Sequence, residues 1–148
     1  MTAEEYLNRY RRINAEIDCK LEEIARYRSM ATRLSPTARF DKNGNVTDKV
    51  GRAVAKIVDL ETEINSEINE LINIREDIIR TISAIDNTDV RTVLEYRYIN
   101  GWSWQKIATK MNYTRDHLTG YLHRKALRTV GEIIKKMMLT LFNTFFML

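Results

Sequence analysis

The sequence has little that would end a helix or cross-link the chain. Its 148 residues include five glycines, one proline and one cysteine. This shortage of turn-forming residues favours long helices with few connections and argues against a β-sandwich or barrel. The single cysteine, Cys19, excludes an internal disulfide framework and agrees with a reducing, cytoplasmic environment.

Membrane spans and catalytic motifs are missing as well. No uninterrupted apolar run approaches the ~20 residues that a membrane helix needs, and residues 2–12 are too polar for a secretory signal. The scattered glycines form no phosphate-binding or dinucleotide-binding loop. His117 and His123 have no cysteine or acid cluster that would complete a metal site. We therefore expect no enzymatic activity, no cofactor, no metal and no membrane partner.

The formal net charge is +4, and it is unevenly distributed. Residues 49–86 contain five basic residues and eight acids, so we do not expect this part to lie along DNA. Residues 91–136 contain ten Lys or Arg against three acids, Glu95, Asp116 and Glu132. The later part of the chain is therefore the one expected to meet an anionic partner.

Two long helices are predicted, over residues 2–33 and 47–85, with a linker at 34–47. Thr2 is placed to cap the first helix with Glu5 as its capping-box partner, and Ser35-Pro36 ends it. In the first helix a series of mostly apolar residues recurs at steps of three and four, so most of them share one stripe: Tyr6, Tyr10, Ile13, Ile17, Leu21, Ile24 and Arg28.

The second helix carries a heptad pattern. Its first seam position holds Val50, Ile57, Ile64, Leu71, Ile78 and Ile85. Its other position holds Val54, Ile68 and Ile82, with Glu61 and Arg75 as interruptions. Extra apolar residues widen the stripe beyond a two-stranded seam: Val58, Leu60, Ile72, Ile74 and Ile79. We expect residues 1–86 to form an antiparallel hairpin or coiled coil that joins copies of the chain into a homodimer or higher homo-oligomer.

Residues 87–136 have the pattern of a helix-turn-helix. Asn87 or Thr88 would cap a helix that ends at Asn100-Gly101, and Ser103 would cap the next one. After a break at Asn112-Tyr113, Thr114 would cap the third helix. The residues expected to point inward are Val93, Leu94, Tyr98, Ile107, Ala108, Met111, Leu118, Leu122 and Tyr121. The alternative is a plain helical hairpin in an all-α core.

A third helix of this kind enters the major groove by its N-terminal end. The side chains expected to read bases are Arg115, Asp116, His117 and Thr119. Those expected at phosphates are Ser103, Lys106, Lys110, Thr114, His123, Arg124 and Lys125. Trp102 and Trp104 would help to hold the motif together. Gly120 is unusual in such a helix, where it costs ~1 kcal/mol relative to alanine.

Residues 137–148 contain no charged side chain and are mostly apolar. Such a segment is not expected to stay in water as a disordered tail. We predict that it packs on the chain's own helices or on a second copy. Docking to RNA polymerase and a weak membrane-surface contact are the alternatives.

The segment VLEYRYINGWSWQKIATKMNYT resembles region 4 of bacterial sigma factors, which reads promoters through a helix-turn-helix. The matching residues are Leu94, Arg97, Tyr98, Gly101, Ser103, Ile107, Ala108 and Thr114. Together with the preceding long helix, residues 48–127 are similar to RinA- and ArpU-like late regulators of phages and prophages of Gram-positive bacteria. This resemblance implies late-gene activation at double-stranded DNA in the cytoplasm of a bacterial host, at the nucleoid.

Two other functions fit an all-α chain of this kind. One is a sigma-like module that docks on RNA polymerase and leaves DNA unread. The other is a phage packaging component similar to a terminase small subunit, which also joins a helix-turn-helix to helical oligomerisation elements.

Overall fold

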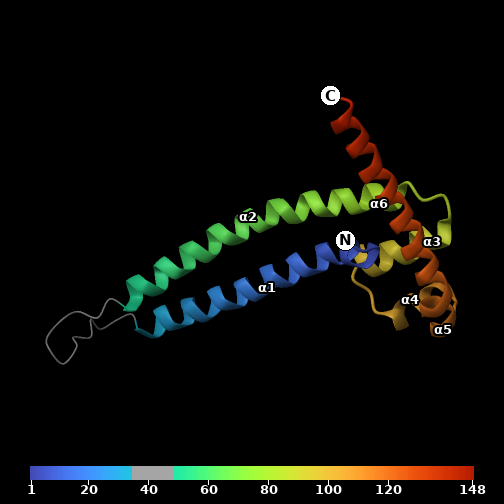
Figure 1. Ribbon diagram of the computed structural model, residues 1–148. Helices are drawn as coiled ribbons and strands as arrows, with labels where there is room; N and C mark the ends of the chain where they lie inside the picture. The colour runs from blue at the N-terminus through green and yellow to red at the C-terminus, as the bar shows by residue number, and fades with distance from the viewer. Residues whose placement is uncertain (35–48) are drawn as a thin grey trace, which may run out of the picture. The chain divides into compact units, whose positions relative to one another are not determined.

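Helices make up every regular element in the part of the chain that the computed structural model describes, residues 1–34 and 49–148 (Figure 1). The predicted all-α fold is confirmed. Of the predicted linker, Leu34 is the last residue of a helix, and residues 35–47 lie outside the described residues. The chain divides into a hairpin unit, Ile13–Leu71, and a larger unit that combines Met1–Arg12 with Ile72–Leu148.

Helix α1 spans Ala3–Leu34 and begins with the predicted capping box. The Glu5 backbone N–H donates to Thr2 Oγ1 over 3.1 Å, and the Thr2 backbone N–H donates to Glu5 Oε2 over 2.8 Å. The bond from the Thr2 backbone is the main cause that lowers the pKa of Glu5. Two of the N–H groups left free at a helix start are thereby satisfied by the residues that the sequence places there.

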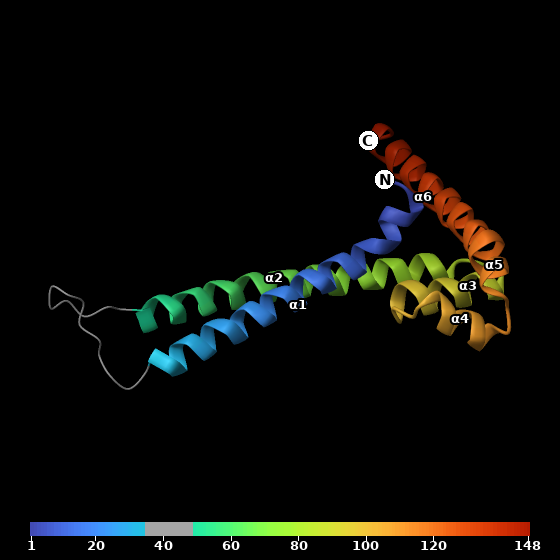
Figure 2. The ribbon, with the colours of Figure 1, turned by 90° about the horizontal axis from the view of Figure 1, so that it is seen from below.

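The hairpin unit pairs residues 13–34 of α1 with the first turns of α2, Lys49–Ser83 (Figures 1 and 2). Its core consists of Ile17, Ile24, Leu60 and Ile64, with Ile13, Tyr27, Ile57 and Leu71 packed against them. Lys20 forms ion pairs with Glu63, at 3.5 Å, and with Glu67. Arg28 pairs with Glu61 at 3.1 Å. The later residue of α1, Arg28, pairs with the earlier residue of α2, Glu61, so the two helices run antiparallel. The predicted antiparallel packing of the first helix on the second is confirmed.

The second seam position of α2 was predicted one residue too late over residues 53–74, whereas Ile82, the last residue of the predicted series, is buried as predicted. Val54 and Ile68 are 49% and 39% exposed, whereas Ala53 and Leu60 are buried. The inward series is therefore Ala53, Leu60 and Ile74, and Glu61 lies outside it. This register keeps the Glu61 carboxylate at the surface beside Arg28, because an uncompensated charge in the seam would lose its hydration. Leu21 of α1, predicted inward, is also exposed.

The larger unit packs the first turns of α1 and the last turns of α2 with the C-terminal helices. Its fully buried side chains are Leu7, Ile78, Ile82, Val90, Val93, Leu94, Ile107, Leu118 and Val130. The buried Tyr6 hydroxyl donates to Asp77 Oδ2 over 2.7 Å and lies 2.8 Å from Thr81 Oγ1. Arg9 pairs with the same Asp77 oxygen at 3.2 Å. Residues 1–12, far away in sequence, are thus tied to the unit by both apolar and polar contacts.

Three helical segments follow α2. Helix α3, Thr88–Leu94, is capped by Asn87, whose side chain accepts from the Val90 N–H over 3.1 Å as predicted. It continues into a π-helical turn, η1, Glu95–Ile99. Helix α4, Trp104–Met111, is followed by α5, Arg115–His117, the π-helical turn η2, Leu118–Leu122, and α6, His123–Phe146. In Figure 2, α3 and α4 lie next to each other, with α6 rising from α5.

The end of α6 does not pack on the chain's own described helices. Residues 137–148 are all exposed, with Leu141 at 70% and Phe145 at 79%. That half of the prediction for this segment is wrong, because α6 continues as a straight helix beyond the core residue Val130. Packing on a second copy stays a prediction. No helix among residues 1–34 and 49–148 is long and apolar enough to cross a membrane.

Candidate nucleic-acid interface

Two capped helices and a tight turn form the centre of the candidate interface. Ser103 Oγ accepts from the Lys106 N–H over 3.3 Å at the start of α4. Asn112 ends that helix in the left-handed region, with φ at 57°, and Thr114 Oγ1 then accepts from the His117 N–H over 3.1 Å. Both caps and the break are as predicted. Residues of the turn itself therefore end α4 and start α5.

The loop before α4 is also fixed locally. Gly101 adopts φ of 70°, a conformation that favours glycine, and the Trp102 N–H donates to the Tyr96 carbonyl over 2.9 Å. The Tyr96 and Trp102 rings stack with their centroids 4.3 Å apart. Arg97 Nη1 donates to the Trp102 carbonyl over 3.0 Å. The predicted stop at Asn100-Gly101 is confirmed.

The helix after the turn is continuous from α5 through η2 into α6, and we call residues 115–128 the recognition helix. Its inward side chains are Leu118, Leu122 and Ala126, and Val130 continues the series just beyond it; all four are at most 5% exposed. The π-helical turn η2 widens the local repeat, so these residues recur every fourth position. Tyr121, predicted inward, is consequently 53% exposed.

Three of the four predicted base-reading residues are accessible. Arg115, Asp116 and His117 are exposed in the first turn of the recognition helix. Thr119 is half-buried, and its hydroxyl donates to the Arg115 carbonyl over 2.9 Å. The base-reading role of Thr119 stays a prediction; with its hydroxyl proton used on its own helix, only the hydroxyl oxygen is left, as an acceptor.

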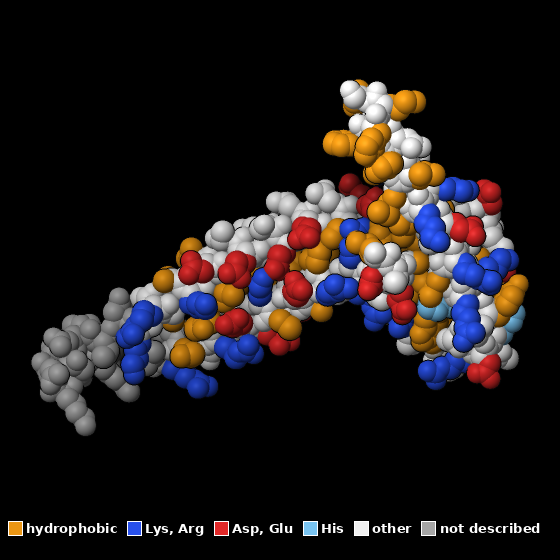
Figure 3. All heavy atoms as spheres, viewed as in Figure 1, with side chains coloured by type: hydrophobic (Ala, Val, Ile, Leu, Met, Phe, Trp, Pro, Cys, Tyr) orange, Lys and Arg blue, Asp and Glu red, His pale blue; other side chains and the backbone are white. Residues whose placement is uncertain are grey.

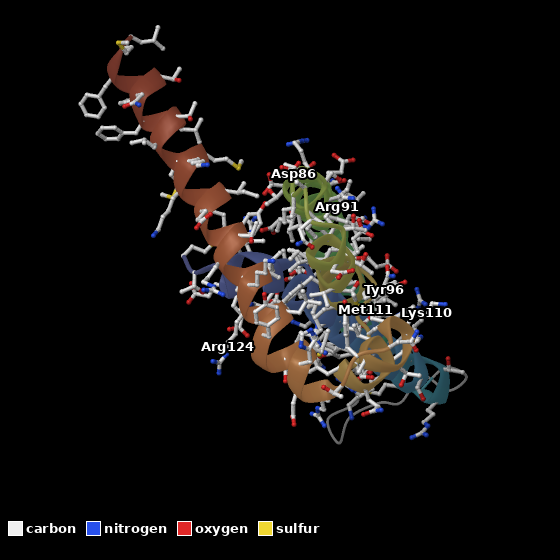
Figure 4. The ribbon with its side chains drawn as sticks, turned by 90° about the vertical axis from the view of Figure 1, so that its right-hand side faces the viewer. Asp86, Arg91, Tyr96, Lys110, Met111 and Arg124 are labelled. Carbon is white, nitrogen blue, oxygen red and sulfur yellow. The ribbon has the colours of Figure 1, made fainter. Side chains whose placement is uncertain are left out.

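The residues predicted to contact phosphates also differ in their exposure and in the contacts they already make. Lys110 of α4 and Arg124 of the recognition helix are exposed and extend away from the helices in Figure 4. The Lys106 ammonium lies 4.1 Å from the centre of the Trp102 ring, and Lys125 is half-buried. The Ser103 and Thr114 hydroxyls already accept capping bonds.

His123 is not placed as a surface phosphate contact. It is half-buried, and its Nε2 lies 2.7 Å from the Tyr98 hydroxyl. Its ring also meets the Trp104 ring edge-on, with centroids 4.5 Å apart. Burial lowers the pKa of His123, against an opposing effect of the Glu4 carboxylate. The phosphate-binding role predicted for His123 is therefore corrected, since the ring is held by its neighbours and loses hydration when charged.

Beside His123 lies a cleft that no sequence pattern indicated. Residues of α1, namely Glu4, Asn8 and Arg11, line it together with Arg97, Tyr98, Trp104, Thr119 and His123. All belong to the larger unit. Neither Arg11 nor Arg97 is among the predicted site residues, because about ninety positions separate them and only the packed fold brings them to one cleft.

An aromatic ladder runs along the other flank of the recognition helix. His117 lies between Tyr113 and Tyr121, with ring centroids 4.8 Å and 5.4 Å away. The Tyr113 hydroxyl donates to Asp89 Oδ2 over 2.9 Å, a bond that raises the pKa of Tyr113. His117 is therefore held in position by rings on both sides while its edge stays exposed.

The chemistry of this surface is that of charge and hydrogen bonding. Figure 3 shows Lys and Arg side chains over the part of the molecule formed by α3 to α6. Within residues 1–34 and 49–148, no group of three or more His, Cys, Asp or Glu side chains could hold a metal ion. The exposed side chains of the turn and of the recognition helix can instead donate to and accept from a polar, anionic partner.

This arrangement defines an all-α protein with a capped helix-turn-helix in its larger unit. The chain belongs to DUF1492, a family of proteins of unknown function, whose family model matches residues 35–131. No curated protein and no solved structure matches it significantly.

Proposed function

We propose that the chain binds double-stranded DNA in a sequence-specific way, as a transcriptional regulator that acts as a homodimer or higher homo-oligomer. The supporting observation is the capped turn that presents Arg115, Asp116 and His117 on the first turn of the recognition helix. The N-terminal turn of such a helix is the part that reaches base edges in the major groove.

The side chains of this surface have distinct roles in this proposal. The Arg115 guanidinium donates to O6 and N7 of guanine, and the Asp116 carboxylate accepts from the amino group of cytosine. His117, held between two tyrosine rings, offers a further donor or acceptor. Lys106, Lys110, Arg124 and Lys125 contact phosphates, which sets the register without reading sequence.

The biological setting of the proposal comes from the resemblance to late regulators of phages and prophages. On that basis the chain activates late genes at the nucleoid of a Gram-positive host. Oligomerisation would present two recognition helices to half-sites about one helical turn apart, or a multiple of it.

A protein partner is the second candidate, and the exposed end of α6 favours it. Met138, Leu141 and Phe145 are 65%, 70% and 79% exposed on a segment without charge. Patches of this kind mark protein-interaction sites. Salt-insensitive binding to RNA polymerase without DNA binding would indicate a sigma-like docking module. A ring of many subunits in light scattering would indicate a packaging component similar to a terminase small subunit.

The proposal is tested by fluorescence anisotropy with duplexes selected from a random pool, repeated across a salt series. We expect a consensus sequence and affinity that rises as salt falls. Arg115→Ala should lose ~1–3 kcal/mol of discrimination at one base position. The control is Arg26→Ala, which removes an exposed arginine of the hairpin unit and should leave DNA affinity unchanged. An Arg115→Ala variant that binds like the control, or a pool that yields no consensus, would refute sequence reading.

A further inference from the structure

The cleft beside the recognition helix gathers positive charge from two distant segments. Arg11 enters it from α1, and Arg97 enters it from η1. Burial lowers the pKa of Arg97, and the nearby Arg11 guanidinium lowers it further. Both guanidinium groups line this one cleft, so each cation makes the charge of the other less favourable.

The cleft lacks enough negative charge of its own to balance these groups. Glu4 is its one acid, and it forms no ion pair with any residue of the described ranges. Arg11 likewise forms no ion pair there. Two guanidinium groups against one carboxylate leave a net positive charge, so an anion in the cleft would relieve the repulsion.

The position of Arg97 is fixed in advance. Its Nη1 donates to the Trp102 carbonyl, and its guanidinium lies 4.5 Å from the centre of the Trp104 ring. A guanidinium has five N–H donors, so several stay available for a ligand. The Asn8 amide adds neutral donors from the turn of α1 next to Arg11. Pre-organised donors of this kind suit the oxygens of a phosphate group.

The cleft also lies beside the proposed DNA-reading surface. Thr119, which lines it, is four residues after Arg115 and therefore about one turn further along the recognition helix. A recognition helix in the major groove is flanked by the phosphates of the groove edge. The cleft is thus within reach of a phosphate that neighbours the bases contacted by Arg115.

We infer that the cleft between Arg11 and Arg97 is a phosphate-binding site, and that a backbone phosphodiester of bound DNA occupies it. The DNA part of this inference rests on the proposed function. The anion chemistry does not, because it follows from the charges of the cleft. In this arrangement the first turns of α1 belong to the nucleic-acid interface. Arg11 of α1 and Arg97 of η1 contact the same phosphate, and this shared contact positions the DNA backbone.

The test uses three single-charge variants of the full chain. Arg11→Gln removes a cation from the cleft, and Glu4→Gln removes its acid. Arg12→Gln is the matched control, since Arg12 is the exposed neighbour of Arg11 and does not line the cleft. Inorganic phosphate is titrated at constant ionic strength against chloride, and binding is followed by the NMR signals of the His123 ring. DNA affinity is measured in parallel across a salt series.

We expect phosphate to shift the His123 signals of the wild type and of Arg12→Gln. The shift should be lost in Arg11→Gln and occur at lower phosphate concentration in Glu4→Gln. The slope of log affinity for DNA against log salt is negative, and it should become less steep by about 0.9 in Arg11→Gln, because one phosphate contact is lost. The consensus sequence should be unchanged, since a phosphate contact does not read bases.

The outcomes separate this inference from the proposed function. If Arg11→Gln behaves like Arg12→Gln in both measurements while Arg115→Ala still loses discrimination, the phosphate site is refuted and the DNA-reading proposal stands. If phosphate binding depends on Arg11 but no variant binds DNA, the anion site stands with a free anion as its ligand. In that case the assignment of a DNA phosphate is refuted.

Discussion

Gly120 lies in the middle of the recognition helix, and neither its backbone conformation nor its neighbours require a glycine there. It belongs to the π-helical turn η2, and its φ is not in the left-handed region. A Cβ added at this position would meet no heavy atom within 4 Å. Glycine in a helix is less favourable than alanine by about 0.5–1 kcal/mol, because it loses more backbone freedom on folding. Replacing Gly120 by alanine should therefore stabilise the fold.

The size of the effect follows from the open space. With no clash to offset the gain, Gly120→Ala should raise the free energy of unfolding by about 0.5–1 kcal/mol. In a chain of this length, 1 kcal/mol corresponds to a rise in Tm of roughly 2–4 °C. Gly131→Ala is the matched control, since Gly131 also lies inside a helix and its added Cβ would be 4.0 Å from Ala3 Cβ, an ordinary contact. Urea unfolding followed by circular dichroism measures both variants.

DNA binding distinguishes the two glycines. Gly120 lies between Asp116 and Arg124 on the exposed side of the recognition helix, where a groove-bound helix comes closest to base edges. A methyl group there should weaken binding of the selected duplex by ~1–3 kcal/mol, the usual cost of overpacking a close contact. Gly131→Ala should bind normally. If Gly120→Ala lowers the free energy of unfolding, the open helical environment of Gly120 is refuted. If the variant is more stable and binds DNA with normal affinity, close approach of DNA to this side of the helix is refuted.

Two further results are expected. Thr114→Ala should lower the free energy of unfolding by about 1 kcal/mol because the His117 N–H loses its cap, and an unchanged urea midpoint would contradict this. Because the pKa of His123 is lowered in the folded protein, the unfolded chain binds a proton at this ring more readily than the folded chain does. The stability that the neutral His123 ring contributes is therefore complete above pH 6.5, and it declines as the pH falls below 6.5. Urea unfolding between pH 5 and pH 7.5 should show a shallower decline in His123→Gln than in the exposed control His117→Gln, and equal slopes would contradict the assignment.

The local signals of the sequence were sufficient for the helices and their ends. The capping box of Thr2 and Glu5, the caps at Asn87, Ser103 and Thr114, and the left-handed stop near Gly101 all form as predicted. Each depends on residues within about four positions of one another. The chemistry of a cap is complete within one turn, so no distant contact is needed to predict it.

The register of α2 could not be settled in the same way. Apolar residues occupy more than one possible seam, and periodicity alone cannot choose between Val54 and Ala53 as the inward residue. The choice follows from which charged side chains find partners. Glu67, on the buried side, is paired with Lys20, and Glu61 is paired at the surface with Arg28. Burial of an unpaired charge costs more than exposure of a valine, and that comparison requires both helices.

The features of the candidate site also differ in whether the sequence alone could predict them. The sequence by itself determined the capped turn and the exposed residues Arg115, Asp116 and His117, because all lie within one short segment. Only the tertiary structure decided that His123 and Thr119 turn toward α1, and that Arg11 meets Arg97 in one cleft. Local hydrogen bonds form between near neighbours in the chain, whereas burial and charge proximity depend on which distant surfaces the core brings together.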